Sequence, residues 1–138
     1  MPLDTLYAYV EGADIEDIAA DLETRFSAFI NSRRWWFDGA ARVVNRRYGW
    51  ETCTPPEDLP LWDLGLNLWS PPPGADLPRW FRDVEAIAGF LGTLHRECGR
   101  DFIIGIASAK TGVAEDLFYV TTDLPNMAEL RAIIGVQD

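Results

Sequence analysis

The sequence predicts a single α+β domain spanning residues 1–138, with one antiparallel or mixed sheet of about five strands. Two long helices and a short C-terminal helix are expected to pack on this sheet, mainly on one face. Three observations predict this class. Apolar residues alternate in several short stretches, and they recur about every 3.6 residues in longer ones. The densest apolar run, residues 101–107, has no polar face and is therefore expected to be an interior strand.

The chain begins with an alternating strand that is followed by a helix. Residues 3–10 alternate between apolar side chains and a second face that carries Tyr7 and Tyr9. Asp14 is placed to cap the next helix, which is predicted over residues 15–32. The buried stripe of this helix consists of Ile15, Ile18, Leu22, Phe26 and Phe29.

Two strands are predicted next, joined by a loop rich in proline and acidic residues. The first covers residues 35–48 and is expected to bend at Gly39, since glycine weakens a strand. The second covers residues 61–69 and shows the clearest alternation in the chain. Its apolar face carries Trp62, Leu64, Leu66 and Leu68. Residues 70–74 end this strand, because proline cannot donate to a ladder of hydrogen bonds.

The second half of the chain predicts a helix, two strands and a short last helix. The long helix lies between an Asp76 cap and a Gly99 stop. Its inward stripe consists of Trp80, Val84, Ile87, Leu91, Leu94 and Cys98. The interior strand at 101–107 follows, and a turn connects it to a further strand at 116–122. The last helix ends at Gly135.

The charge distribution favours a basic protein partner. The chain has a formal net charge of −10. Its first 24 residues contain seven acids and no base, namely Asp4, Glu11, Asp14, Glu16, Asp17, Asp21 and Glu23. A field of this sign repels nucleic acid and attracts basic proteins. We therefore expect no direct binding to DNA or RNA.

The sequence also predicts a cytoplasmic location without membrane insertion. No apolar run approaches the roughly 18 to 20 residues that cross a bilayer. The N-terminus has neither the basic region nor the long apolar region of a secretory leader. Cys53 and Cys98 are far apart in the sequence and are expected to be reduced thiols.

No catalytic residue, cofactor or metal site is expected, and the protein is predicted not to be an enzyme. His95 is the only histidine, and it precedes Cys98 by three residues on the same predicted helix. Cys98 lies in the inward stripe, however, where burial raises rather than lowers a thiol pKa. A glycine-containing stretch at 105–111 lacks the spacing and the following helix of a phosphate-binding loop.

These features together resemble a bacterial immunity protein, the small antidote encoded beside a secreted or contact-delivered toxin. The resemblance rests on a single acidic, tryptophan-rich α+β domain without a catalytic constellation. Residues 76–107 and the acidic elements that flank them carry it. It implies tight inhibition of a cognate protein toxin whose active-site surface is basic.

The candidate surface for this partner combines carboxylates with tryptophans. Carboxylates steer association with a basic protein, and aromatic anchors slow dissociation. We expect either the first helix or the loop at 57–58 to supply the acids, with an exposed tryptophan beside them. The candidate residues are Asp14, Asp17, Asp21, Trp36, Glu57, Asp58 and Trp69.

Two further interpretations remain open. The first is a small enzyme or ligand-binding domain, because paired arginines on one strand suit carboxylate or phosphate ligands. Its pocket would be lined by Tyr7, Tyr9, Trp36 and either Arg42 or Arg46. The second is a structural subunit of a larger assembly, which an extensive self-interface would support.

Overall fold

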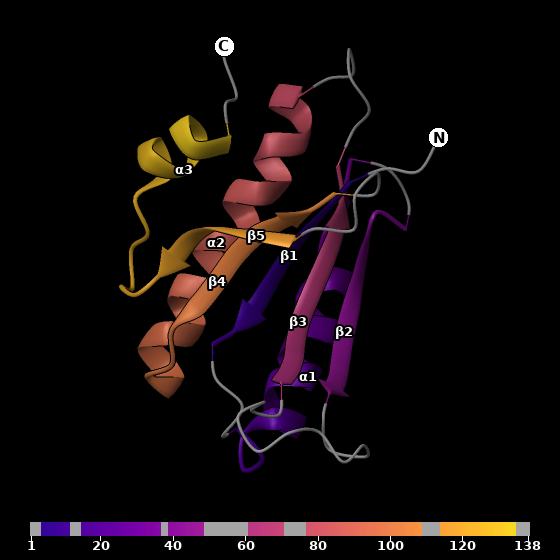
Figure 1. The fold of residues 1–138 in the computed structure, drawn as a ribbon, viewed down its shortest axis with the longest axis vertical. Helices are drawn as coiled ribbons and strands as arrows, with labels where there is room; N and C mark the ends of the chain where they lie inside the picture. The colour runs from indigo at the N-terminus through magenta and orange to yellow at the C-terminus, as the bar shows by residue number, and fades with distance from the viewer. Residues whose placement is uncertain are drawn as a thin grey trace.

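The described residues of the computed structural model form a five-stranded antiparallel sheet and three helices (Figure 1). These residues are 4–11, 15–36, 39–48, 61–70, 77–108 and 114–134. The predicted α+β class is confirmed, including two longer helices and a short C-terminal one. The sheet is antiparallel at every described pairing, which decides between the two arrangements that the sequence allows.

The elements follow the predicted order along the chain. The strands are β1 (Thr5–Val10), β2 (Ala41–Tyr48), β3 (Leu61–Trp69), β4 (Phe102–Ala107) and β5 (Ala114–Val120). The helices are α1 (Ala19–Asn31), α2 (Leu77–Cys98) and α3 (Met127–Ile134).

The strand order β2-β3-β1-β4-β5 places β1 at the centre of the sheet. Strand β4 lies between β1 and β5, so the interior position predicted for residues 101–107 is confirmed. Strands β2 and β5 are the two edges. Both neighbours of β1 pair with it through apolar positions, since Leu6 lies opposite Leu68 on one side and Ile106 on the other.

The hydrophobic core lies between the sheet and the two longer helices. In Figure 1, α1 and α2 lie on the same side of the sheet, behind its strands. Helix α1 contacts β2 and β3, whereas α2 contacts β4 and β5. Three fully buried phenylalanines, Phe26, Phe81 and Phe102, come from α1, α2 and β4. Burying each such ring contributes about 1.5 to 3 kcal/mol, so the two helices are held mainly by apolar contact.

Helix α1 begins later than predicted. The sequence places its start at residue 15, but residues 16–18 form a turn and the helix begins at Ala19. The backbone N–H of Ile18 donates to the carbonyl of Ile15 at 3.0 Å, and no side chain caps the helix. Because Ile15 is fully buried, this turn docks on the core before the helix starts. Asp14, the predicted cap, lies outside the described residues.

Strand β2 is shorter than the predicted strand over residues 35–48. Gly39 has a φ of 84°, a conformation that a strand does not use, and regular pairing begins at Ala41. Trp35 instead donates its indole N–H to the carbonyl of Ile30 at 3.0 Å, back toward α1. The predicted strand is therefore interrupted at Gly39 rather than bent, and only Ala41–Tyr48 forms β2.

Strand β5 is shifted toward the N-terminus relative to the prediction. It covers Ala114–Val120, whereas the sequence predicts residues 116–122. The register between β4 and β5 shifts at Ile104 and Gly105, which leaves Leu117 without an opposite residue. This β-bulge lets pairing continue as far as Ala107 and Ala114.

Helix α3 packs on α2 beside the edge strand β5 (Figure 1). Leu130 is fully buried and anchors it. The guanidinium of Arg131 lies 4.9 Å from the centre of the Phe81 ring on α2, which adds a cation–π contact. None of the helices in the described ranges has the length and apolar character that crossing a bilayer requires.

Candidate functional site

The two predicted acids of the first helix lie at the protein surface. Asp17 lies in the turn before α1 and Asp21 in its first helical turn, and both are exposed. The opposite face of α1 buries Leu22 and Phe26, as the helical stripe predicts, and also Ala19, which the stripe does not include. Ile18 and Phe29 of the stripe are only partly buried. A carboxylate near a helix N-terminus is favoured by the helix dipole. Neither Asp17 nor Asp21 forms an ion pair with another residue in the described ranges, so these charges remain available to a partner.

The two candidate tryptophans lie side by side. The indole N–H of Trp36 donates to the backbone carbonyl of Trp69 at 2.9 Å, and both side chains are half-buried. The backbone N–H of Trp36 donates to the buried carboxylate of Asp83 at 2.8 Å. The guanidinium of Arg42 lies 5.5 Å from the centre of the Trp69 ring. Both tryptophans are thus held in place by contacts of their own.

Three further candidate residues, Asp14, Glu57 and Asp58, lie outside the described residues. Their predicted role in partner binding therefore stays a prediction. The same holds for the side chain of Arg46, although its backbone in β2 pairs with that of Asp63 in β3.

The two candidate tyrosines lie on the front face of the sheet, by which we mean the face turned away from α1 and α2. Their rings stack with centroids 5.1 Å apart. The Tyr9 hydroxyl donates to Oδ1 of Asn67 at 2.7 Å, and the Tyr7 hydroxyl donates to Oδ1 of Asp116. Both hydroxyls are therefore engaged within the protein.

A row of aligned residues crosses all five strands on this front face. The register places Arg42, Asn67, Tyr7, Gly105 and Asp116 next to one another in that order. The row runs from a cation on β2 to an anion on β5, with polar and aromatic groups between them. Tyr7 reaches Asp116 because Gly105, between the two, has no side chain. The structure thus brings together Tyr7, Tyr9 and Arg42 on one face, as the ligand-pocket interpretation expects, and adds Asn67 and Asp116.

Asp116 is shared by two phenols. The Tyr119 hydroxyl also approaches its carboxylate, with 3.5 Å between Oη and Oδ2. Burial, followed by the hydrogen bond to Asp116, raises the pKa of Tyr7 well above its ordinary value. The negative charge of Asp116 is the main cause that raises the pKa of Tyr119. Both tyrosines therefore remain protonated donors at neutral pH.

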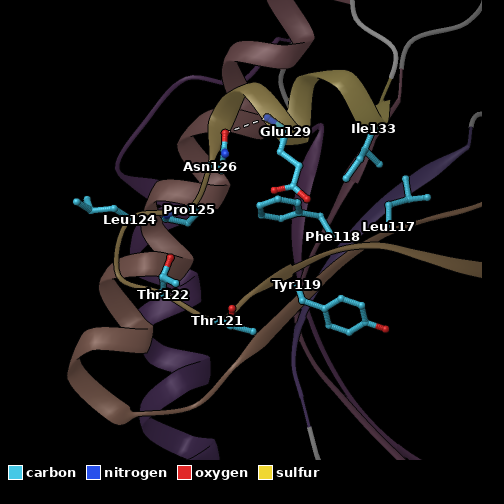
Figure 2. Close-up of a pocket in the computed structure, with 10 residues that line it drawn as sticks. All are labelled: Leu117, Phe118, Tyr119, Thr121, Thr122, Leu124, Pro125, Asn126, Glu129 and Ile133. Carbon is cyan, nitrogen blue, oxygen red and sulfur yellow. Dashed lines mark hydrogen bonds between the residues drawn. The ribbon is translucent and has the colours of Figure 1, made fainter.

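A groove lies between β5 and α3, at residues that the sequence did not single out as a binding surface (Figure 2). It has a volume of about 440 Å³. Its lining consists of Leu117, Phe118, Tyr119, Thr121, Thr122, Leu124, Pro125, Asn126, Glu129 and Ile133. We call it the β5–α3 groove. In the described part of the chain, the three large apolar residues that stand out as exposed, Tyr119, Leu124 and Ile133, all line it.

Glu129 is the carboxylate among the residues that line the β5–α3 groove. Glu129 extends from α3 toward β5 (Figure 2), and it lies in the first turn of α3, where the side chain of Asn126 accepts its backbone N–H at 3.0 Å. Glu115, Asp116 and Asp123 are also exposed on β5 and on the loop that follows it. The sequence feature that could have indicated this surface is Leu124, a large apolar residue between the turn-forming Asp123 and Pro125.

The histidine and the cysteine considered for catalysis have structural surroundings. Nδ1 of His95 lies 2.9 Å from a carboxylate oxygen of Asp123, and Nε2 lies 3.5 Å from one of Asp101. His95 therefore connects α2 to the start of β4 and to the loop before α3. Cys98 is a free, partly buried thiol that packs against the core. Within the described ranges, no group of three or more histidine, cysteine or acidic side chains is arranged to hold a metal ion.

Comparisons with known protein families, with curated proteins and with solved structures find no match to this chain.

Proposed function

We propose that this protein is an immunity protein that binds a basic protein toxin and neutralises it. One observation carries the proposal, which is the exposure of Asp17 and Asp21 in an N-terminal segment that contains no basic residue. Carboxylates that have no ion-pair partner among the described residues can meet a basic surface without first breaking an internal contact. The resemblance in size, charge and tryptophan content supports the same class.

The physical basis of the proposal is electrostatic steering followed by anchoring. A net charge of −10 accelerates encounter with a basic surface, and the effect depends on ionic strength. Large aromatic side chains then supply most of the binding energy in many interfaces. Trp36 and Trp69 are half-buried and fixed, so they would lose little conformational freedom on binding.

The alternative of a pocket for an anionic ligand has less support. The hydroxyls of Tyr7 and Tyr9 already donate to Asp116 and Asn67. The β5–α3 groove is lined by Glu129, and Glu115, Asp116 and Asp123 are exposed on β5 and the loop after it, so the charge near the groove repels anions.

The experiment is a purification of the tagged protein from its native host, followed by a neutralisation assay with the recovered partner. We expect one stoichiometric basic protein, encoded beside this chain, that is toxic when expressed without it. The double variant Asp17→Asn with Asp21→Asn should slow association about tenfold at low salt. The double variant Glu85→Gln with Glu97→Gln removes the same charge from α2 and serves as the control.

Two results would count against the proposal. If the host expresses the neighbouring gene and no partner is recovered, the immunity function is wrong. If the two double variants slow association equally, the acids of α1 have no special role and net charge alone explains the rate.

A further inference from the structure

The β5–α3 groove combines an apolar lining with a strand edge that pairs with no other described strand. Strand β5 is the last strand of the sheet on its side, and α3 faces it across the groove (Figure 2). Two exposed apolar residues line the groove, since Leu124 is 89% exposed and Ile133 is 40% exposed. A groove between an edge strand and a helix is the geometry in which an extended peptide adds a strand to a sheet.

The hydrogen-bond alternation of the sheet shows which backbone groups of β5 point into solvent. The N–H of Glu11 donates to the carbonyl of Asp101 at 2.9 Å, so these two residues form a hydrogen-bonded pair between β1 and the start of β4. The pairs alternate along an antiparallel ladder, so Phe102 and Ile104 direct their backbone groups toward β5. Their partners on β5 are Val120 and Phe118.

Tyr119 lies between these two partners on β5 and is opposite Ile103. Its backbone N–H and carbonyl therefore point away from β4, toward the free edge. Its side chain lies on the other side of the strand from α3 (Figure 2). An added strand could thus pair with the Tyr119 backbone while its side chains contact Leu124 and Ile133.

The acidic residues near the β5–α3 groove favour a basic segment as its occupant over a second copy of this chain. Glu129 lines the groove, and Glu115, Asp116 and Asp123 are exposed on β5 and on the loop that follows. Asp116 already accepts the Tyr7 hydroxyl and a carboxylate oxygen of Asp123 lies 2.9 Å from Nδ1 of His95, so Glu115 and Glu129 carry most of this charge. The basic residue of α3, Arg131, lies against the Phe81 ring of α2. A second copy of the chain, pairing through its own β5, would place these acids near one another, and like charges on paired strands are destabilising. A basic segment would instead be attracted by them.

We propose that the β5–α3 groove binds an extended, basic segment of the partner protein as a sixth strand of the sheet. This inference rests on the proposed function, because it assigns the surface with which the toxin is held. The acids of α1 would then steer the encounter, while the groove supplies backbone hydrogen bonds and apolar contact.

The first test is an NMR titration of the full-length protein with a short peptide of alternating lysine and valine. We expect shifts in the amide signals of β5 and α3, and slower hydrogen exchange at the Tyr119 amide. The same peptide with alternate backbone amides N-methylated keeps its charge but loses half of its donors. It should bind about tenfold more weakly. A peptide of alternating glutamate and valine should not bind.

A pair of protein variants tests the backbone contact from the other side. Tyr119→Pro removes the edge N–H, and proline is tolerated where an edge strand faces solvent. Tyr119→Ala removes the same side chain but keeps the N–H. We expect Tyr119→Pro to bind the lysine–valine peptide about tenfold more weakly than Tyr119→Ala, provided that both melt like folded proteins. Should Tyr119→Pro fail to fold, the N-methylated peptide still decides the question.

The proposal is overturned if N-methylation leaves binding unchanged, or if the shifts spread over the acidic residues of α1 as strongly as over β5. Its failure is distinguishable from that of the proposed function. If the toxin is neutralised but the peptides do not bind in the groove, the groove assignment alone is wrong. If the peptides bind in the groove and no toxin is recovered from the host, the immunity function alone is wrong.

Discussion

The Asp116 carboxylate accepts hydrogen bonds from Tyr7 and Tyr119 on the front face of the sheet. The pKa values of these two tyrosines are raised for different reasons. Tyr7 is nearly buried, so desolvation is the largest cause of its raised pKa. Tyr119 is about half exposed, and the charge of Asp116 is its largest cause. A hydrogen bond from a buried phenol to a carboxylate holds the phenol proton, because ionisation would place two negative charges side by side.

The raised pKa of Tyr7 predicts a loss of stability in alkaline solution. An unfolded tyrosine has a pKa of about 10, below that of Tyr7 in the folded protein. The folded state therefore holds this proton more tightly. Its contribution is fully present below about pH 10 and is lost as pH rises through the folded-state pKa.

We expect the free energy of unfolding to fall as pH rises above about 10, and to fall less in Tyr7→Phe. Urea denaturation at several pH values measures this. The ultraviolet absorbance of tyrosinate provides the control, because one of the four tyrosines should ionise only with unfolding. Ionisation of all four near pH 10 would contradict the prediction.

Replacement of Gly105 by alanine should also destabilise the protein. A Cβ at this position would lie 2.2 Å from Oη of Tyr7 and 2.4 Å from the backbone carbonyl oxygen of Glu115. The Glu115 carbonyl belongs to the paired strand and cannot move without disturbing the β-bulge. Gly105→Ala should therefore lower the free energy of unfolding by about 1 to 3 kcal/mol.

Gly89 provides the matched control for that substitution. It lies within α2, and an added Cβ would meet nothing within 4 Å. Gly89→Ala should raise stability by about 0.5 to 1 kcal/mol, because alanine favours the helix. Chemical denaturation of both variants measures the two signs. Equal effects of the two substitutions would contradict the prediction, because they would mean that Tyr7 and the Glu115 carbonyl can move away from a Cβ at position 105.

At the scale of elements, Asp83 joins α2 to the segment that follows α1. Its carboxylate is buried on α2 and accepts hydrogen bonds from Nη2 of Arg33 at 2.7 Å and from the backbone N–H of Trp36 at 2.8 Å. The two oxygens thus fix the chain between α1 and β2. The same contact orients Trp36, whose indole reaches Trp69.

Replacement of Asp83 should therefore be costly. We expect Asp83→Ala to lower the free energy of unfolding by about 2 to 4 kcal/mol, because it leaves a partly buried guanidinium and a backbone N–H without their acceptor. Arg82→Ala, an exposed change on the same helix, should alter stability by less than about 0.5 kcal/mol. Thermal and urea denaturation measure both. Tryptophan fluorescence of Asp83→Ala should also shift, and similar melting of the two variants would rule out this role for Asp83.

At the scale of the whole molecule, the excess of acidic residues opposes folding through self-repulsion. The net charge of −10 acts at neutral pH, and salt screens charges at the surface. We expect the melting temperature at pH 7 to rise by about 2 to 5 °C when NaCl is raised to about 0.5 M. The rise should be smaller for Asp17→Asn with Asp21→Asn. A melting temperature that falls with added salt would mean that attractive ion pairs dominate instead.

The sequence by itself was sufficient to predict the helices and strands of the fold and the side on which each is buried. Alternation predicted the bounds of β3 as they are, and the helical stripe predicted that Asp17 and Asp21 are exposed, as they are in the turn before α1 and in its first turn. These predictions succeed because the direction of a side chain repeats with a fixed local period. The bounds of α1, β2 and β5 were less accurate, because a buried turn, a glycine with positive φ and a β-bulge depend on distant contacts.

Only the tertiary structure decided which residues of different strands meet. The row from Arg42 to Asp116 exists because five strands pair in one particular order and register. No local period specifies that order, which depends on how all the strands share the core with α1 and α2. The position of β5 at the edge follows from the same choice, as does the groove that it forms with α3. The sequence thus determined the elements and the acidic character of the protein, whereas long-range packing decided the shape of the surfaces to which the proposals assign binding.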